Sequence, residues 1–460
     1  MIRLFRVFIP ASVLALLVSE VFLVLGCYAV ASLFTTYLNP WTYLIEEGNY
    51  WKLLVVVGLI ILGMYFQDLY AELRVVSRLL LIQQVCLSVG SALLVVAFLG
   101  YLDPTLLLGR WLMIAGSFGV ILILPLWRVF YWRYVIAVLR SERVLLLGSS
   151  SILGEVAEVV LAKPEFGYTI LGYLCEEGPC DFPVPCLGTI DDLKRVCQEY
   201  NPTRIVVGMA ERRNRLPVQE LLGIRFGGVM IEDAADTYEV ALRRVCSRKI
   251  QPSQLIFSSE LGPRPQAIAI QGFYSFVIGA IGLALLSPLM LLTALAVKLS
   301  SKGPVLYRQR RVGVNGKIFT VYKFRSMYVD AEARTGAVWA KKDDPRITPA
   351  GRWLRKLRLD ELPQLWNVVK GDMAIVGPRP ERPEFVDVLA HQIPYYRQRL
   401  AVKPGITGWA QINHKYGDTE LDAMIKLEYD LYYIKNVAAA LDFYIIFHTV
   451  KVMLLSRGAQ

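Results

Sequence analysis

The chain has 460 residues, 55% of them hydrophobic and 19% charged, with a formal net charge of +11. This composition is too apolar for an ordinary soluble protein, and the length suits two or three domains. The seven cysteines form no C-x-x-C pair, which favours a reduced cytosolic setting over a zinc site.

The first third of the chain is predicted to form a membrane bundle. Four apolar segments are each about long enough to cross a bilayer, namely residues 8–33, 50–66, 79–99 and 111–127. Basic residues precede the first segment and follow the fourth, so both ends of this region are expected to face the cytoplasm. Glu20, inside the first segment, is either functional or, as is commoner in a small bundle, a packing partner.

From residue 143 the pattern changes to alternating strands and helices. Predicted strands cover residues 144–147, 168–175 and 204–208, and a helix is expected near 191–200. This β-α-β order predicts a parallel sheet of Rossmann type.

The first turn of this sheet matches a dinucleotide-binding fingerprint only in part. Gly148 is in place, but Ser150 occupies the second glycine position and Gly154 comes one residue late. Glu176 or Glu177 lies somewhat beyond the distance expected of a ribose-binding acid. Dinucleotide binding therefore remains an alternative hypothesis, and the favoured interpretation is that this region is a regulatory or oligomerising module.

A fifth apolar segment contains no charged residue from 266 to 297 and is interrupted by Ser287 and Pro288. Proline removes a helical hydrogen bond, so a kink is expected there. Both flanks are basic, and a full crossing would place one of them outside. We therefore predict a re-entrant helix at about residues 270–299 that enters and leaves on the cytoplasmic face, with a kinked fifth span as the alternative.

The stretch that follows is strongly basic. Residues 298–358 contain 16 Lys and Arg against 4 Asp and Glu. Such a stretch suits nucleic acid, anionic lipid or a polyphosphate substrate. No nucleic-acid motif accompanies it and it directly follows an apolar segment, so lipid headgroups and a phosphate substrate are predicted, with no nucleic-acid partner.

Asp360 and Glu361 are adjacent carboxylates at the expected start of a helix. Such a pair can supply a nucleophile and a magnesium ligand, and a helix N-terminus attracts phosphate oxygens. Basic neighbours such as Arg358 are expected to lower the pKa of the aspartate and to screen its repulsion from a diphosphate. The alternative is that Asp360 is only the N-cap of the helix.

Arg379 stands between Pro378 and Pro380, which restrict its backbone and place its guanidinium for phosphate binding. The alternative is a structural arginine paired with a carboxylate such as Glu384. Further candidates for phosphate binding are Lys323, Arg325, Arg346 and Arg358.

Several motifs occur in order over about residues 267–460. They are K-F-R-S-M from Lys323, D-P-R-I-T from Asp344, L-D-E-L-P-Q-L-W-N from Leu359, G-D-M from Gly371, V-G-P-R-P from Val376, K-P-G-I-T-G-W-A-Q-I-N from Lys403 and Y-D-L-Y-Y-I from Tyr429. The chain thereby resembles the bacterial sugar transferase family, in the large monotopic form of the polyprenyl-phosphate phosphoglycosyl transferases. The run from Gly377 to Phe385 is similar to members associated with exopolysaccharides.

Together these patterns predict a membrane α plus α/β protein with three domains. A four-helix transmembrane bundle is expected at residues 1–135, a Rossmann-like cytoplasmic domain at 136–250, and an α-rich catalytic domain with the re-entrant helix at 251–460. The expected location is the bacterial cytoplasmic (inner) membrane, with the catalytic domain on the cytoplasmic face.

The resemblance implies transfer of a sugar 1-phosphate from a nucleotide sugar, usually a UDP-sugar, to a polyprenyl phosphate such as undecaprenyl phosphate, with release of UMP. It implies that Asp360 is the attacking aspartate of a covalent phosphosugar intermediate and that Glu361 is associated with Mg²⁺. Ser287 and Pro288 match the break of the family's re-entrant helix. The reaction would initiate exopolysaccharide or another glycan.

The implied partners are the carrier lipid, the nucleotide sugar, downstream glycosyltransferases and export machinery, and a homodimer through the N-terminal domains is expected from architecture alone. Two other functions stay open. One is a glycosyltransferase that releases UDP, and the other is a membrane scaffold or regulator of polysaccharide export. Apolar segments with almost no internal charge argue against a transporter.

Overall fold

The structure is a computed structural model that describes residues 2–35, 42–71, 73–75, 77–139, 142–176, 178, 182–209, 216–249, 262, 264–329, 346–414 and 419–454. The chain divides into two compact units, Met1–Arg3 with Phe8–Thr237 and Leu4–Val7 with Tyr238–Gln460. The first unit contains most of the predicted transmembrane region and most of the predicted middle domain. The finer division at residues 135 and 250 stays a prediction.

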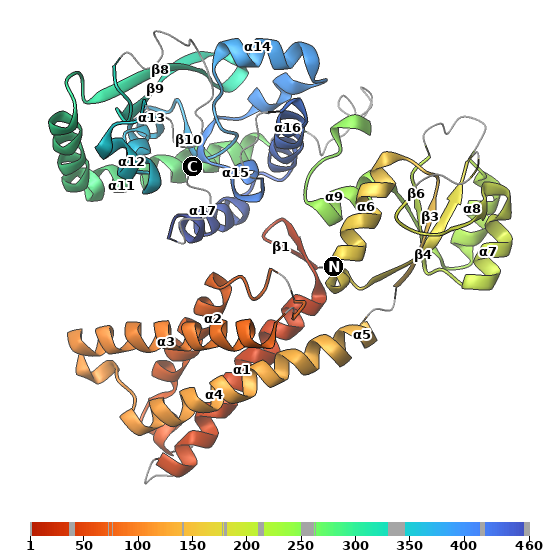
Figure 1. Ribbon diagram of the computed structural model, residues 1–460, viewed down its shortest axis with the longest axis horizontal. Helices are drawn as coiled ribbons and strands as arrows, with labels where there is room; N and C mark the ends of the chain where they lie inside the picture. The colour runs from red at the N-terminus through yellow and green to blue at the C-terminus, as the bar shows by residue number, and fades with distance from the viewer. Residues whose placement is uncertain are drawn as a thin grey trace. The chain divides into compact units, whose positions relative to one another are not determined.

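Long apolar helices form the N-terminal region (Figure 1). The four predicted segments are confirmed as the helices α1 (Ala11–Thr35), α2 (Tyr50–Phe66), α3 (Arg78–Leu102) and α4 (Arg110–Phe130). Three of them, α1, α3 and α4 with its extension to Val135, are long and apolar enough to cross a membrane, whereas α2 has 17 residues. Short elements nearby are β1 (Ile2–Leu4), β2 (Val7–Ile9), η1 (Thr42–Glu46), η2 (Pro104–Leu106), η3 (Tyr131–Val135) and α5 (Ile136–Leu139).

Glu20 lies fully buried among these helices. Its carboxylate accepts a hydrogen bond of 2.6 Å from the Tyr70 hydroxyl and one of 3.1 Å from Arg128 Nη2. Arg128 Nη1 also donates to the carbonyl oxygen of Leu69 at 2.7 Å. A buried charge is tolerated when it is paired and hydrogen-bonded, so these contacts fit Glu20 as a packing partner that joins α1 to α4.

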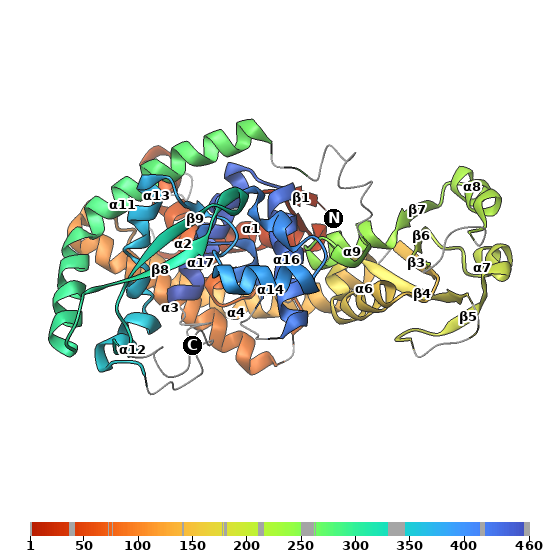
Figure 2. The same cartoon turned by 90° about the horizontal axis from the view of Figure 1, so that it is seen from above.

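The middle region contains a five-stranded parallel sheet with the strand order β5-β4-β3-β6-β7, which confirms the predicted α/β class. Its strands are β3 (Glu142–Leu147), β4 (Tyr168–Cys175), β5 (Cys186–Thr189), β6 (Arg204–Val207) and β7 (Met230–Asp233). In Figures 1 and 2, α6 (Ser151–Ala162) lies on one side of the sheet, and α7 (Leu193–Tyr200) and α8 (Val218–Phe226) lie on the other. Cover on both faces explains why the central strand β3 is a run of buried leucines.

The turn that begins at Gly148 follows β3. Because β3 pairs with β4 on one side and with β6 on the other, this turn lies where the strand order reverses, which is where open α/β sheets bind ligands. Gly148 has a φ of +104°, and a Cβ there would lie 2.9 Å from the backbone of Gly208. Close packing of the two strand ends therefore accounts for this glycine without a nucleotide. Dinucleotide binding and a regulatory role both stay predictions.

The C-terminal region is mainly helical. Its α-helices, among the described residues, are α9 (Ala234–Leu242), α11 (Pro265–Ser300), α12 (Pro349–Lys356), α13 (Gln364–Lys370), α14 (Pro383–Gln392), α15 (Trp409–Asn413), α16 (Glu420–Lys435) and α17 (Ala439–Leu454). Its strands form two small sheets, the antiparallel pair β8 (Leu306–Val312) with β9 (Ile318–Phe324) and the parallel pair β10 (Ala374–Val376) with β11 (Gly405–Thr407). Single helical turns are η6 (Ser247–Lys249), η7 (Val314–Gly316), η8 (Leu359–Glu361) and η9 (Tyr396–Ala401).

The fifth apolar segment forms α11, a helix of 36 residues that contains Pro288, and Figure 2 shows it as a bent ribbon with two arms. Proline has no N–H, which leaves the carbonyl oxygen of Ala284 without its helical donor. The Ser287 hydroxyl donates to that oxygen at 2.7 Å. The Ser-Pro pair thus makes a bend and supplies a hydrogen bond that the bend removes.

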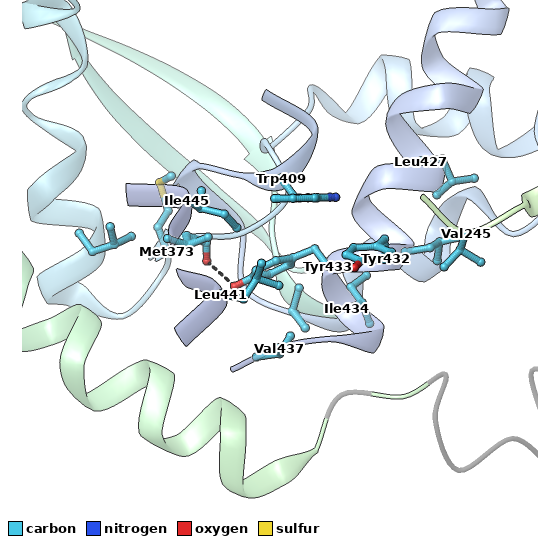
Figure 3. Packing of buried hydrophobic residues seen from close by; sticks show 14 of the residues in the cluster. Val245, Met373, Trp409, Leu427, Tyr432, Tyr433, Ile434, Val437, Leu441 and Ile445 are labelled. Carbon is cyan, nitrogen blue, oxygen red and sulfur yellow. Dashed lines mark hydrogen bonds between the residues drawn. The ribbon is translucent and has the colours of Figure 1, made fainter. Parts of the chain in front are cut away.

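The hydrophobic core of the C-terminal region joins α15, α16 and α17 to β10 (Figure 3). The rings of Trp409 and Tyr432 stack at 5.6 Å between centroids. The Tyr433 hydroxyl donates to the carbonyl oxygen of Val376 at 3.2 Å, which anchors the end of β10. The loop that carries Arg379 leaves this core directly after Val376.

Candidate active site

Asp360 and Glu361 lie in the tight turn η8 between α12 and α13, not at the cap of a helix. The turn is entered through Arg358, which has a φ of +58°, and Pro363 is the N-cap of α13. The prediction that Asp360 caps the following helix is therefore wrong. The left-handed conformation of Arg358 reverses the chain direction before η8. Both carboxylates therefore lie in this separate turn, and α13 begins only at Gln364.

Glu361 is the centre of a cluster of cationic side chains. Its Oε1 atom accepts hydrogen bonds from Lys323 Nζ at 2.9 Å and from Arg379 Nη2 at 3.0 Å. Arg358 Nη1 lies 3.9 Å from Oε2. The cluster brings together β9, the loop after β10 and the turn η8, so three of the five predicted phosphate-binding residues meet at one carboxylate. Arg379 pairs here with Glu361 and not with Glu384.

The two carboxylates differ in their electrostatic surroundings. Burial, together with the adjacent charge of Glu361, raises the pKa of the Asp360 carboxyl to about 6. Burial acts on Glu361 in the same direction, but the charges of Lys323, Arg379 and Arg358 outweigh it and hold the pKa of Glu361 well below its usual range. The prediction of a lowered Asp360 pKa is wrong, because the cations concentrate on Glu361 while Asp360 has lost solvent.

Asn367 is a site residue that sequence reasoning did not single out. It is fully buried in α13, and its side-chain amide donates to the carbonyl oxygen of Thr320 at 2.7 Å and accepts from the N–H of Tyr322 at 3.1 Å. These two bonds attach the side chain to β9 much as a neighbouring strand would, one residue before Lys323. The sequence feature that could have identified Asn367 is a polar amide on the buried face of a short helix, because a buried amide needs hydrogen-bond partners.

The structure does not bring Arg325 into the Glu361 cluster. Arg325 is buried, and its guanidinium donates to the carbonyl oxygens of Ser301 at 2.7 Å and of Pro304 at 2.5 Å, just beyond the end of α11. Arg346 lies beside the Met327–Ile347 bridge, where its carbonyl oxygen accepts from Tyr328. The preceding residues of its motif, 344 and 345, lie outside the described residues.

The carboxylates of η8 fit magnesium only if substrate and water supply most of the ligands. Among the residues that the structure describes, no group of three or more His, Cys, Asp and Glu side chains could enclose a metal ion. Magnesium, however, commonly takes one or two carboxylates and completes its shell with substrate phosphates and water. Glu361 Oε2 suits this use, because its 3.9 Å contact with Arg358 is too long for a hydrogen bond.

These features define a class of protein: a membrane-bound protein with apolar helices, a parallel α/β region and a C-terminal region that carries a partly buried acid pair among cations. The sequence pattern of the family described as "Bacterial sugar transferase" matches residues 266–456. The sugar transferase EpsL of Bacillus subtilis, named as uncharacterized, is 42% identical over 178 residues, which cover 38% of this chain and 82% of that protein. The chain belongs to the bacterial sugar transferase family.

Two relatives with more specific names are similar over longer stretches. The UDP-N-acetylgalactosamine-undecaprenyl-phosphate N-acetylgalactosaminephosphotransferase of Aeromonas hydrophila is 46% identical over 198 residues, 43% of this chain and 47% of that protein. The UDP-glucose:undecaprenyl-phosphate glucose-1-phosphate transferase of Xanthomonas campestris pv. campestris is 34% identical over 316 residues, 66% of this chain and 65% of that protein. The chain thus aligns with less than two thirds of each of these two relatives.

Proposed function

We propose that the protein is a polyprenyl-phosphate hexose-1-phosphate transferase, which moves a sugar 1-phosphate from a UDP-sugar to undecaprenyl phosphate and releases UMP. The observation that carries the proposal is the arrangement at η8, where Glu361 holds Lys323 and Arg379 and leaves the neighbouring Asp360 outside those ion pairs. The names of the Aeromonas and Xanthomonas relatives support the reaction class. They differ in the sugar, so the donor is proposed only as a UDP-hexose.

In the first step, a carboxylate oxygen of Asp360 attacks the phosphorus next to the sugar. The new bond joins that oxygen to phosphorus, the bond from phosphorus to the UMP oxygen breaks, and UMP leaves with the electron pair. In the second step, a phosphate oxygen of undecaprenyl phosphate attacks the same phosphorus and the Asp360 carboxylate leaves. No proton is consumed, because both substrates and both products carry the same total charge.

The raised pKa of Asp360 suits a nucleophile. At neutral pH the carboxylate is still mainly ionised, and a more basic carboxylate is a stronger nucleophile than one with a pKa near 4. Because Lys323 and Arg379 donate these hydrogen bonds to Glu361, the charge of Lys323 lowers the pKa of Asp360 less than burial and Glu361 raise it.

Lys323, Arg379 and Arg358 are proposed to bind the diphosphate. Each is partly exposed, with 20%, 28% and 31% of the side chain accessible, so each can meet a substrate while it stays near Glu361. Arginine offers a planar pair of donors to phosphate oxygens. Mg²⁺, held by Glu361 and substrate oxygens, would neutralise charge on the leaving phosphate.

The bent helix α11 is proposed to be re-entrant, with both ends on the cytoplasmic face of the inner membrane. Basic residues flank both ends of the helix, and the Ser287–Pro288 bend supports a turn inside the bilayer. A site at the membrane surface suits a reaction that joins a water-soluble nucleotide sugar to a lipid. The lipid-linked product would then serve downstream glycosyltransferases and export machinery.

The reaction is tested by product identity. Purified protein is incubated with Mg²⁺, undecaprenyl phosphate and a panel of UDP-sugars, and UMP and UDP are measured. The proposal expects release of UMP by the wild-type protein and a phosphosugar-protein adduct in its mass spectra. Asp360→Asn should abolish both the release of UMP and the adduct. Release of UDP would instead indicate simple glycosyl transfer. Neither nucleotide from any donor would favour the scaffold or regulator of export.

The topology is tested with single cysteines in a cysteine-depleted background. Cysteines in place of Gln266 and Lys302, at the two ends of α11, should both be protected from a membrane-impermeant maleimide added to intact spheroplasts. A cysteine in place of Thr105, in the turn between α3 and α4, should be labelled and is the control. Labelling at one end of α11 would mean a full crossing and would rule out the re-entrant helix.

A further inference from the structure

Two residues of the loop that carries Arg379 have no backbone N–H to donate. The loop leaves β10 after Val376, and Pro378 and Pro380 lack the donor that other residues have. The carbonyl oxygens of the loop therefore supply much of the hydrogen bonding that holds Arg379 in position.

Four consecutive carbonyl oxygens of this loop accept hydrogen bonds from four different donors. The oxygens of Pro378 and Glu381 accept from the backbone N–H groups of Gly405 and Val312, at 3.0 and 2.9 Å. Those of Arg379 and Pro380 accept instead from the guanidinium groups of two arginines. The donors are Arg399 Nη2 at 3.1 Å to Arg379 and Arg311 Nη1 at 2.8 Å to Pro380.

Arg399 lies in η9 and is nearly inaccessible, with 6% of its side chain exposed. Asp430 of α16, with 2% exposed, balances its charge, and Oδ2 of that residue accepts from Arg399 Nε at 2.9 Å and lies 2.8 Å from Nη2. Nη1 donates to the Tyr396 hydroxyl at 3.0 Å. Each nitrogen of the guanidinium therefore has a partner, and one of these partners is the backbone of Arg379.

A net gain in stability does not explain such a buried ion pair. Removing two charges from water costs free energy, and their attraction often no more than offsets that cost. Only a guanidinium offers enough donors, in a rigid plane, to hold Asp430, Tyr396 and a carbonyl oxygen at once. The arrangement is therefore suited to fixing geometry.

We infer that Arg399, oriented by Asp430, is a positioning residue for Arg379. By holding the carbonyl oxygen of Arg379, it directs the Arg379 guanidinium to Glu361 and to the phosphate of the donor. This inference rests on the proposed phosphosugar transfer, in which Arg379 binds the diphosphate of the donor. Arg399 itself makes no contact with Glu361 among the described interactions.

The test is Arg399→Lys, which retains the positive charge beside Asp430 but has one nitrogen where the guanidinium has three. We expect kcat for UMP release to fall about 10- to 100-fold, since small displacements of a phosphate-binding group have effects of this size, while KM changes little. Arg397→Lys is the matched control. Arg397 lies in the same turn and pairs with Asp387 on the surface, with 65% and 67% of the two side chains exposed.

A double-mutant cycle distinguishes positioning from a general structural role. If Arg399 acts through Arg379, adding Arg399→Lys to Arg379→Lys should cost much less than it costs in the wild-type protein. Costs that multiply, or equal activity of Arg399→Lys and Arg397→Lys, would overturn the inference.

A second variant tests the inference if Arg399→Lys folds poorly, and a second measurement tests it if the wild-type protein shows no activity. Arg399→Gln combined with Asp430→Asn leaves no unpaired buried charge and should show the same fall in kcat. Hydrogen exchange of the peptide containing Arg379 should become faster in Arg399→Lys and stay unchanged in Arg397→Lys. Absence of UMP from the wild type would refute the proposed function, whereas unchanged exchange in both variants would refute the positioning role.

Discussion

The parallel sheet of the middle region and the small sheets of the C-terminal region hold their residues in place by different means. In the middle region, β3 pairs over its whole length with β4 and over four residues with β6, and Leu145, Leu146 and Leu147 are fully buried. In the C-terminal region, β10 and β11 pair only through Ala374 with Gly405 and Val376 with Thr407. The candidate site is attached to this short pair, to turns and, through Lys323, to the antiparallel pair of β8 and β9.

This difference in hydrogen bonding predicts which property, stability or turnover, a substitution changes in each region. A long ladder repeats one main-chain bond many times, so loss of a side chain weakens the sheet without moving it. Where single buried polar side chains join segments, as Asn367 joins α13 to β9 and Arg325 holds the chain after α11, we expect loss of one group to move the segment that it holds. We therefore expect substitutions in the middle region to affect stability and those at the site to affect turnover.

The largest effect on turnover beyond Asp360 is expected at Glu361. Glu361→Gln removes the charge that Lys323 and Arg379 share, so both cations should lose their orientation and magnesium its carboxylate. We expect kcat to fall about 100- to 1,000-fold, the range for loss of a preorganised electrostatic group. Glu384→Gln, on an exposed carboxylate of α14, is the control. An equal loss in the control would contradict the role of Glu361.

A smaller loss of turnover is expected for Asn367→Leu, which keeps the size of the side chain but leaves the Thr320 carbonyl and the Tyr322 N–H without their partner. Lys323 should shift with β9, and kcat should fall about 10- to 100-fold. Steady-state kinetics and thermal unfolding are measured together with Trp366→Leu, an exposed position on the same helix. Full activity of Asn367→Leu would show that β9 is held without this amide.

The pH dependence of kcat should report Asp360. Because its pKa is raised to about 6, kcat should be level above that pH and fall about tenfold per unit below it, as the nucleophile becomes protonated. Glu361, with its lowered pKa, stays ionised over this range. A profile that stays level down to pH 4.5 would contradict the raised pKa.

The smallest effect on turnover is expected in the middle sheet. Leu145→Ala creates a cavity at a fully buried position of β3 and should lower the free energy of unfolding by about 2–5 kcal/mol. Turnover per folded molecule should stay unchanged, because the ladders of β3 keep the sheet in register. Denaturant unfolding and kcat are measured on one preparation. A fall in kcat as large as that of Asn367→Leu would remove the distinction between the two regions.

The sequence predicted the secondary structure well where one physical signal dominates. Runs of apolar residues predicted α1 to α4 and α11 within a few residues, and buried β-branched and leucine runs predicted β3 and β6. It was less reliable at η8, where local capping rules pointed to an N-cap at Asp360. The left-handed conformation of Arg358 reverses the chain there, and capping rules do not include such a conformation in a residue other than glycine.

By itself, the sequence determined the membrane helices, the parallel α/β region, the family and the residues Asp360, Glu361 and Arg379 as a chemical set. These follow from composition, periodicity and short motifs, which are local. Only the tertiary structure decided that the cations gather on Glu361, that the pKa of Asp360 is raised, and that Asn367 and Arg399 hold the site together. Each of these depends on burial and on contacts between segments far apart in the chain, and neither can be read from neighbouring residues.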